Sequence, residues 1–307
     1  MPDPILVTGA HRSGTTWVGR MLCAGGGALY IHEPFNNVRP DGPTWVPKSF
    51  PYWFYCLSDT DHAYDRLLQN VIEMKYPLLP ALARSRSLRH IGRAARDWSL
   101  SLAARMRRER PLVKDPIALF STEWLAKRFG MTVVVLIRHP AAFAASLKRL
   151  DWWFKFSNWS DQERLMRTYL AEYAEPIRKY VSGKKDLIDQ AILMWNCMYS
   201  VVNRYRVKHP DWAFVRHEDL AGDPVKGYQA LYAHCRLAWN PAAEEAVRKF
   251  SQQPDAKPLS ADRPTDIRRE SRKTVSVWKR ILTPEEADRI RAGTRKIAKS
   301  FYDPKEW

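Results

Sequence analysis

The chain has 307 residues, 45% of them hydrophobic, so it is long enough to enclose one large core or two small ones. It has no uninterrupted apolar run of about 18 residues, which excludes a transmembrane helix on sequence grounds. The formal net charge of +17 favours an anionic partner, such as a nucleic acid, a membrane surface, an acidic substrate or an anionic cofactor.

The chain opens with a predicted strand over residues 4–9, a loop and the start of a helix. Gly9 and Gly14 have the spacing of the phosphate-binding pattern G-x-x-x-x-G-K-[ST]. Backbone N–H groups of such a loop converge on an anion at the positive end of a helix. Thr15 stands where ATP and GTP enzymes have the lysine that reaches the β- and γ-phosphates, and the nearest cation is Arg12. The loop therefore favours a nucleotide with a 5′-phosphate but no triphosphate.

A short predicted strand over residues 28–32 ends at His32 and is followed by Glu33 and Pro34. Pro34 restricts the turn, so Glu33 is expected at a defined position after the strand. Two interpretations of Glu33 stay open: a carboxylate with a chemical role, or a turn carboxylate that pairs with a nearby cation. If the strand extends through both residues, the His32 side chain points away from that of Glu33.

Residues 60–110 are predicted to form a basic helical insertion. Between positions 84 and 110 there are nine arginines against Asp97 and Glu109, with apolar residues interleaved at helical spacing. Three interpretations are considered: a solvated helix face, a surface that docks on anionic lipid or polysaccharide, and a nucleic-acid site. The third is disfavoured because the chain has no RNA- or DNA-binding motif.

Two further strands end in polar residues. A strand over residues 111–114 ends in Lys114, which Asp115 and Pro116 follow. The continuous β-branched run over residues 131–137 is the clearest buried strand of the chain. It leads to Arg138, at the end of a strand where open α/β sheets bind ligands, and then to a helix over residues 140–149 that carries Ser146. Arg138 and Ser146 together can offer a fixed cation and a hydroxyl to a second phosphate.

Alternating strands and helices predict an α/β fold, a three-layer αβα arrangement with a central parallel sheet of the P-loop NTPase-like kind and a helical insertion. We expect residues 1–307 to form a single domain. A last strand is expected at residues 212–216, and residues 252–273 are expected to form a long loop. The remaining helices are predicted at residues 15–24, 120–129, 161–180, 186–208, 224–235 and 241–250, with a final helix capped by Thr283 and Pro284.

The four cysteines, Cys23, Cys56, Cys197 and Cys235, are widely spaced and form no C-x-x-C motif. We therefore expect buried free thiols and no metal site. The chain begins directly with a predicted strand and not with a basic and then apolar leader. Both features favour a cytoplasmic location. The oligomeric state cannot be predicted.

The loop and the Arg138 segment resemble the sulfotransferase family that uses 3′-phosphoadenosine-5′-phosphosulfate. Residues 12–17, Arg-Ser-Gly-Thr-Thr-Trp, are similar to that family's 5′-phosphosulfate loop, and Arg138 and Ser146 to its 3′-phosphate pair, with the usual eight-residue separation. The resemblance extends in the expected order to residues 112–116, Trp195, residues 215–220 and Trp278-Lys279.

The resemblance implies a fold, a donor and roles for individual residues. The donor would be bound without a metal by Arg12, Ser13, Gly14, Thr15, Thr16 and Trp17, with the Trp17 ring on adenine. Glu33 resembles the base of the carbohydrate sulfotransferases, and Lys114 could contact the sulfuryl group. Asp115 is the second candidate for the base, or a residue that shapes the strand end. Arg272 and Lys273 resemble a further 3′-phosphate segment, but Thr274 replaces its glycine, so a surface charge run is equally consistent.

The resemblance leaves the acceptor open. A glutamate base, basic helices and 13 tryptophans favour a carbohydrate or glycolipid hydroxyl, and a peptide tyrosine or a small phenol fits less well. Two other functions are considered. A P-loop kinase would need ATP and Mg²⁺ but lacks the lysine after Gly14. A non-catalytic nucleotide-binding adaptor at an anionic surface would bind adenosine 3′,5′-bisphosphate without turnover.

Overall fold

The computed structural model describes residues 3–36, 44–183, 186–251 and 275–307. Its centre is a five-stranded sheet in the order β2-β3-β1-β4-β5, and each strand is parallel to its neighbours. This sheet confirms the predicted fold class. The strands, each within one residue of its predicted bounds, are β1 (Ile5–Gly9), β2 (Ala28–His32), β3 (Arg110–Lys114), β4 (Thr132–Ile137) and β5 (Ala213–Arg216).

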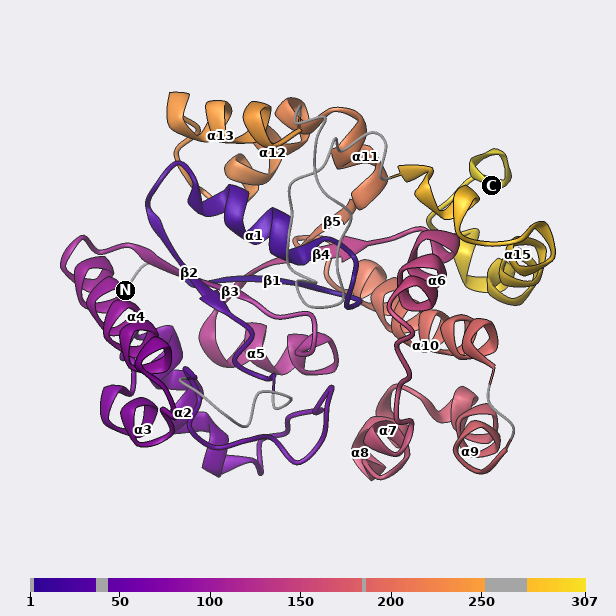
Figure 1. The fold of residues 1–307 in the computed structure, drawn as a ribbon, viewed down its shortest axis with the longest axis horizontal. Helices are drawn as coiled ribbons and strands as arrows, with labels where there is room; N and C mark the ends of the chain where they lie inside the picture. The colour runs from indigo at the N-terminus through magenta and orange to yellow at the C-terminus, as the bar shows by residue number, and fades with distance from the viewer. Residues whose placement is uncertain (1–2, 37–43, 184–185, 252–274) are drawn as a thin grey trace.

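Helices cover both faces of the sheet, as the strand patterns require (Figure 1). On one face, Ile5 and Val7 of β1 pack into a cluster with α1 (Thr15–Cys23), α12 (Pro224–His234) and α13 (Pro241–Ser251). On the other face, Leu6 lies in the larger cluster, with α5 (Thr122–Phe129), α6 (Pro140–Arg149) and α10 (Leu187–Lys208). The side chains of β1 alternate between the two clusters because successive residues of a strand point to opposite faces.

Three helices occupy the chain between β2 and β3, where the helical insertion is predicted. They are α2 (His62–Ile72), α3 (Leu78–Ala83) and α4 (Leu88–Met106). Helix α4 packs beside β2, the edge strand, and lies at the outer left of the molecule in Figure 1. Ser87 caps α4, since its side chain accepts a hydrogen bond from the His90 N–H.

The predicted helix over residues 161–180 is wrong as a continuous element. The structure has instead α8 (Glu163–Thr168), a 3₁₀ turn at Ala171–Tyr173 and α9 (Ala174–Ser182), after a short α7 (Ser157–Ser160). Pro176 explains the break, because inside a helix a proline removes a hydrogen bond and clashes with the preceding turn. In the structure it lies in the first turn of α9, where no such bond is needed. A six-residue helix, α11 (His217–Gly222), was not predicted.

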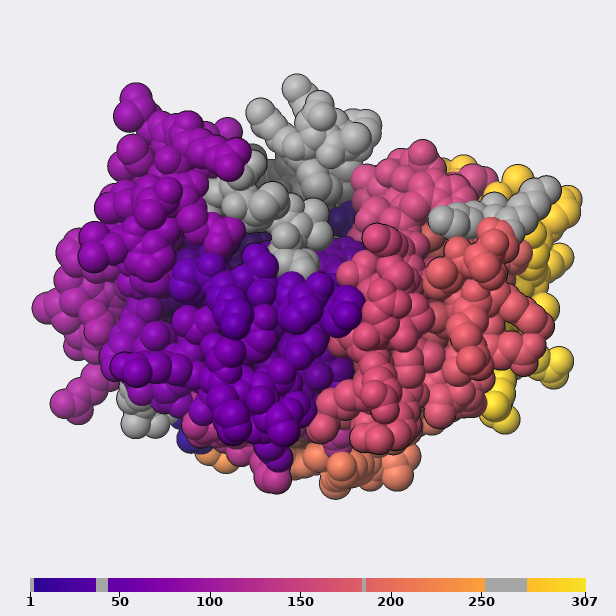
Figure 2. Space-filling view, turned by 90° about the horizontal axis from the view of Figure 1, so that it is seen from below, coloured from indigo at the N-terminus to yellow at the C-terminus, as the bar shows by residue number. Residues whose placement is uncertain are grey.

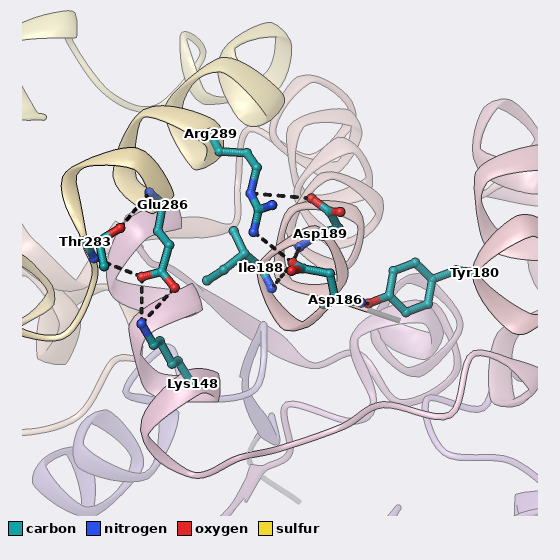
Figure 3. A network of polar contacts seen from close by, with 8 residues as sticks. All are labelled: Lys148, Tyr180, Asp186, Ile188, Asp189, Thr283, Glu286 and Arg289. Carbon is teal, nitrogen blue, oxygen red and sulfur yellow. Dashed lines mark hydrogen bonds and ion pairs between the residues drawn. The ribbon is translucent and has the colours of Figure 1, made fainter. Parts of the chain in front are cut away.

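The final helix, α15 (Pro284–Ala298), begins with the predicted threonine cap, and Thr283 and Glu286 form a full capping box. Polar contacts join this helix to two others (Figure 3). The Lys148 Nζ of α6 lies 2.7 Å from the Glu286 carboxylate, and Arg289 Nη2 lies 2.9 Å from the Asp186 carboxylate at the start of α10. These contacts tie α6, which carries Ser146, to α15, and α15 in turn to α10.

All four cysteines are free thiols, as predicted; Cys56, Cys197 and Cys235 are buried, and Cys23 is half-buried. Burial raises the pKa of Cys56 to about 11 and that of Cys235 to about 12, so both stay protonated at neutral pH. Within the described ranges, no helix combines the length and the apolar character that crossing a bilayer requires.

Candidate active site

The carboxyl ends of all five strands meet at one edge of the sheet, because the strands are parallel. The residues that follow each strand are therefore brought to the same edge. They are the loop from Ala10 to Gly14 after β1, Glu33 after β2, Asp115 after β3, Arg138 after β4 and His217 after β5. Four of these five positions were singled out from the sequence, and His217 was noted only within a longer motif.

The two glycines of the loop lie where a side chain would not fit. Gly9 has φ 139°, and a Cβ there would collide with the Leu136 carbonyl oxygen of β4. Gly14 has φ 97°, and a Cβ there would lie 2.5 Å from His217 Nδ1. Both φ values lie in the region that favours glycine. The loop is thus pressed against β4 and α11, and its N–H groups precede the first turn of α1, where helix N–H groups lack intrahelical partners.

The structure brings together the two segments that were predicted to hold the donor. Arg12 Nε donates to Ser146 Oγ at 3.1 Å, and Arg138 Nη1 donates to the Arg12 carbonyl oxygen at 3.0 Å. Arg12 itself has φ 65°, an uncommon value for a residue with a side chain. The contacts place two guanidinium groups and one hydroxyl beside the glycine loop. Such a set can bind phosphate groups through charge-assisted hydrogen bonds.

Two aromatic residues of α10 fix the backbone of Arg138. The Arg138 N–H donates to the Tyr199 hydroxyl at 2.8 Å, and Trp195 Nε1 donates to the Arg138 carbonyl oxygen at 3.0 Å. Glu218 accepts from the N–H of the next residue, His139, at 3.1 Å. The Tyr199 contact was missed from the sequence, because a tyrosine inside a long amphipathic helix carries no signal for such a bond.

Several buried polar atoms at the loop lack a hydrogen-bond partner within the described part of the chain. They include Ser13 Oγ, Trp17 Nε1, Arg138 Nε and both ring nitrogens of His11 and of His217. Buried polar atoms are nearly always hydrogen-bonded in folded proteins, so such a cluster calls for an explanation. A phosphate-rich ligand at the loop would supply acceptors for the Ser13 hydroxyl and the Arg138 guanidinium. The residues present therefore fit a nucleotide with phosphate groups at this edge.

Glu33 lies outside β2 and forms an ion pair with Lys114, whose side chain is fully buried. Glu33 Oε2 also accepts from Asn36 Nδ2 at 2.6 Å and lies 3.7 Å from His32 Nε2. Because β2 ends at His32, the condition under which His32 was expected to point away from Glu33, a strand through both residues, is not met. Glu33 has φ 45°, a left-handed conformation that breaks the strand alternation and returns its carboxylate to the side of His32.

Opposing effects act on the Glu33 carboxyl group. Burial by itself favours the neutral form, but the Lys114 ammonium, the neighbouring His32 and two hydrogen bonds lower the pKa of Glu33 below its ordinary value. Glu33 is therefore a carboxylate at neutral pH, in the charge state that a base requires. The ion pair matches the interpretation of Glu33 as a carboxylate paired with a nearby cation, and its chemical role stays a prediction.

Asp115 is fully buried and serves as an acceptor for two backbone groups. Its carboxylate accepts from the Phe35 N–H at 2.7 Å and from the Ile117 N–H at 2.9 Å. Burial, with the nearby Glu33 charge, raises the pKa of Asp115 to about 7, although both N–H donors favour the carboxylate form. The contacts favour the second interpretation of Asp115, a residue that shapes the strand end and the turn that follows Glu33.

A chain of side-chain contacts links the loop to Glu33. The Tyr30 hydroxyl hydrogen-bonds with Thr16 and lies 3.2 Å from His32 Nδ1, and His32 approaches Glu33. Gly19 lets α1 approach the sheet here, because a Cβ would lie 2.9 Å from the Tyr30 ring and 3.1 Å from Lys114. No role was predicted for Tyr30. The alternation of side chains along a strand predicts which face of the sheet a residue occupies, but it does not predict which helix packs over that residue.

Trp17 lies largely in the core, 6% exposed, with its ring edge-on to His217 and Tyr228. Stacking on adenine stays a prediction for it. Thr15 is buried in the first turn of α1. Arg272 and Lys273 lie outside the described residues, and so does the whole of the predicted loop over residues 252–273. Trp278, of the motif that follows them, stacks on His139 with centroids 5.6 Å apart.

The tryptophans of the aromatic segments near the loop differ in exposure. Trp45 and Trp159 are buried, whereas Trp153 is 45% exposed. Trp53 and Trp152 are half-buried and pack at the loop, where the buried His11 ring lies 4.1 Å from Trp152 and 6.0 Å from Trp53. Burial and the nearby Arg12 charge hold the pKa of His11 well below its ordinary value, so its imidazole is neutral. Aromatic side chains thus form one wall beside the loop.

The chain is similar to a known protein family and to several solved structures. Residues 4–241 match a family model described as the sulfotransferase family. A sulfotransferase domain from the curacin biosynthetic pathway is 15% identical, with 95% of this chain and 97% of that chain covered and a TM-score of 0.49. A sulfotransferase domain from the olefin synthase of Synechococcus PCC 7002 is 18% identical, with 98% and 96% covered and a TM-score of 0.49.

A mouse sulfotransferase, solved in complex with PAP, is 12% identical, with 97% of this chain and 86% of that chain covered and a TM-score of 0.44. The comparison with curated proteins found no match. The family match covers more than three quarters of the chain, from before the glycine loop to the start of α13.

Proposed function

Because this chain belongs to the sulfotransferase family and is an enzyme that uses 3′-phosphoadenosine-5′-phosphosulfate, we propose that it sulfates a hydroxyl of a carbohydrate or glycolipid. We propose further that Glu33 is the general base. The experiments described below test the other candidate base and the other acceptor classes as alternatives.

The observation that carries this proposal is the position of Glu33. Its carboxylate lies at the same sheet edge as the glycine loop and is linked to that loop through His32, Tyr30 and Thr16. A base must lie within hydrogen-bond reach of the hydroxyl that it deprotonates, and this edge is where the donor loop would present the reacting group. Asp115, the other candidate, is fully buried and already accepts two backbone hydrogen bonds.

The residues of the loop would hold the donor, which supplies the sulfuryl group. The N–H groups at residues 13–16 and the hydroxyls of Thr15 and Thr16 surround the 5′ end, and Arg12 neutralises charge there. Arg138 and Ser146 bind the 3′-phosphate, and Arg272 and Lys273 are proposed to add to that site. Positioning and electrostatic stabilisation carry most of the catalysis in transfers of this kind.

Transfer is proposed to proceed in line. The acceptor oxygen forms a bond to sulfur while the bond between sulfur and the 5′-phosphate oxygen breaks. Glu33 takes the proton of the acceptor hydroxyl, which becomes more acidic as its oxygen bonds to sulfur, so a carboxylate with a low pKa is a sufficient base. Lys114 stabilises charge on the transferred group, and adenosine 3′,5′-bisphosphate leaves.

The acceptor class is supported by the glutamate base and by the aromatic wall at the loop. Trp53 and Trp152 are half-buried next to the glycine loop, and flat aromatic faces bind sugar rings well. A cytoplasmic location and a single domain over the whole chain are proposed with this function.

Two assays test the proposal in order. Thermal unfolding is first compared with adenosine 3′,5′-bisphosphate and with ATP and Mg²⁺, because a ligand that binds the folded state raises the melting temperature. Transfer from ³⁵S-labelled donor is then measured to an oligosaccharide, a glycolipid and a phenol. Sulfation of the sugars is the expected result. Sulfation of the phenol alone would refute the acceptor class, and stabilisation by ATP and Mg²⁺ alone would refute the donor site.

A further inference from the structure

Helix α4 carries an apolar stripe on its exposed side. Apart from Leu100, which is 48% exposed on another side of the helix, five of its large apolar residues are well exposed: Leu88 by 87%, Ile91 by 45%, Trp98 by 41%, Leu102 by 37% and Met106 by 78%. Ala95 is exposed as well. These residues are spaced by three or four positions, so they lie on one side of the helix and run along its whole length. We call these six residues the α4 stripe.

The buried side of α4 carries small side chains. Ala94, Ser101 and Ala104 are its buried residues, and they contact the rest of the protein. The helix therefore packs through small side chains and leaves its large ones in solvent. This reverses the usual arrangement, in which the large apolar residues of a surface helix face the core. Exposed apolar surface of this extent indicates a binding surface.

Arginines surround the stripe. The segment from residue 84 to residue 110 has nine arginines against two acids, a net charge of +7. Arg89, Arg96 and Arg105 are exposed on α4 itself, and Arg107 and Arg108 are exposed immediately after it. An exposed helix with an apolar face that includes a tryptophan, flanked by arginines, has the composition of helices that lie in the interface of a bilayer.

We propose that the α4 stripe docks this protein on an anionic lipid bilayer. The apolar side chains enter the boundary between headgroups and acyl chains, and the arginines bind the lipid phosphates. Charge complementarity favours an anionic bilayer over a second copy of the chain. A second copy of the chain would bring a segment of charge +7 against another of the same charge. An anionic polysaccharide would satisfy the arginines but would leave the apolar stripe without a partner.

The position of α4 suits a flat partner. The helix lies at the outer end of the molecule, away from the C-terminal segment, and forms part of the surface there (Figure 2). It packs beside β2, the edge strand that leads to Glu33. Docking through α4 would bring that edge of the sheet closest to the lipid. The inference does not depend on the acceptor, because it concerns a surface and not the reaction.

The test is cosedimentation of the full chain with vesicles. Vesicles of phosphatidylcholine alone are compared with vesicles that contain about one third phosphatidylserine. The first variant is Ile91→Asp with Leu102→Asp, and the second is Leu88→Asp with Met106→Asp, at the two most exposed positions. Val207→Asp is the matched control, since Val207 is 79% exposed on α10, far from the stripe in the chain. Thermal unfolding checks that each variant is folded.

We expect the parent chain and the control to bind anionic vesicles, with affinity falling as salt rises. Each stripe variant should bind at least about tenfold more weakly. Reversing charge by Arg89→Glu with Arg96→Glu should weaken binding by a similar factor, whereas Lys299→Glu, at an exposed lysine of the C-terminal region, should not.

Three results would overturn the inference. One is absence of binding to anionic vesicles by the parent chain. Another is binding that depends on the arginines but not on the stripe, which would indicate a purely electrostatic surface such as one for polysaccharide. The last is a dimer of the parent chain in analytical ultracentrifugation that becomes a monomer in the stripe variants, which would assign the stripe to contact between copies.

Discussion

Replacing Glu33 tests both the chemistry and the electrostatics of the site. Lys114 is fully buried and paired with Glu33, and Glu33 is 15% exposed. Glu33→Gln removes the negative partner and leaves a buried ammonium without it. Breaking a buried ion pair in this way costs about 3–5 kcal/mol of unfolding free energy. We expect the lower end, about 3 kcal/mol, because the partial exposure of Glu33 lets water reach the pair.

A double-mutant cycle separates the ion pair from the catalytic role. Lys114→Met alone and Glu33→Gln with Lys114→Met complete the cycle, and unfolding in urea gives the four free energies. The double variant should recover much of the stability lost in Glu33→Gln, with a coupling energy in the upper half of the range of about 0.5–3 kcal/mol seen for contacting residues. It should remain inactive in ³⁵S transfer, because it has no base, while it still binds adenosine 3′,5′-bisphosphate.

The direction of the Glu33 pKa shift fixes how the contribution of Glu33 to stability changes with pH. The pKa of Glu33 is lowered in the folded state, so its contribution to stability is present above the unfolded value of about 4.3 and is lost as the pH falls through the folded pKa. The stability difference between the parent chain and Glu33→Gln should thus be full at pH 7 and shrink in acid. Glu73→Gln is the control, because its partner Lys75 is 56% exposed and the expected loss is below about 1 kcal/mol.

Two results would contradict these expectations. If Glu33→Gln unfolds at the same urea concentration as the parent chain, the buried ion pair does not carry the stability assigned to it. If Glu33→Gln retains turnover, Glu33 is not the base.

Three other substitutions address the donor site and the second carboxylate. Arg138→Ala should weaken binding of adenosine 3′,5′-bisphosphate in calorimetry by about tenfold or more, since a hydrogen bond to a charged group is worth about 1.5–3 kcal/mol; unchanged affinity would remove Arg138 from the 3′-phosphate site. Gly14→Ala should lose nucleotide binding, because its φ is 97° and a Cβ would lie 2.5 Å from His217 Nδ1, whereas Gly92→Ala, in open space on α4, should bind normally. Asp115→Asn should lower the unfolding free energy by about 2 kcal/mol, since one of the two N–H groups loses its acceptor, and should keep measurable turnover. An inactive Asp115→Asn beside an active Glu33→Gln would make Asp115 the base.

Much of the fold follows from local pattern. The five strands lie within one residue of their predicted bounds, because short apolar runs bounded by glycine, proline or charged residues indicate strands, whether buried like β1 or half-buried like β5. Helix ends with strong local signals, such as Thr283 and Pro284, were likewise predictable. The single large error is the continuous helix predicted over residues 161–180. That prediction gave more weight to the apolar spacing than to Pro176, which in the structure lies in the first turn of α9.

The sequence by itself determined that Gly9, Gly14, Glu33, Lys114 and Arg138 follow or end strands, and parallel pairing then brought them to one edge. Only the tertiary structure decided how they pair. The contacts of Lys114 with Glu33, of Arg12 with Ser146 and of Arg138 with Tyr199 join residues 61 to 134 positions apart, and no local pattern encodes such distances. The tertiary structure also decided which side of α4 faces the core. Its apolar periodicity was visible in the sequence, but periodicity does not say which face meets the core, and the structure buries the small residues and exposes the large ones.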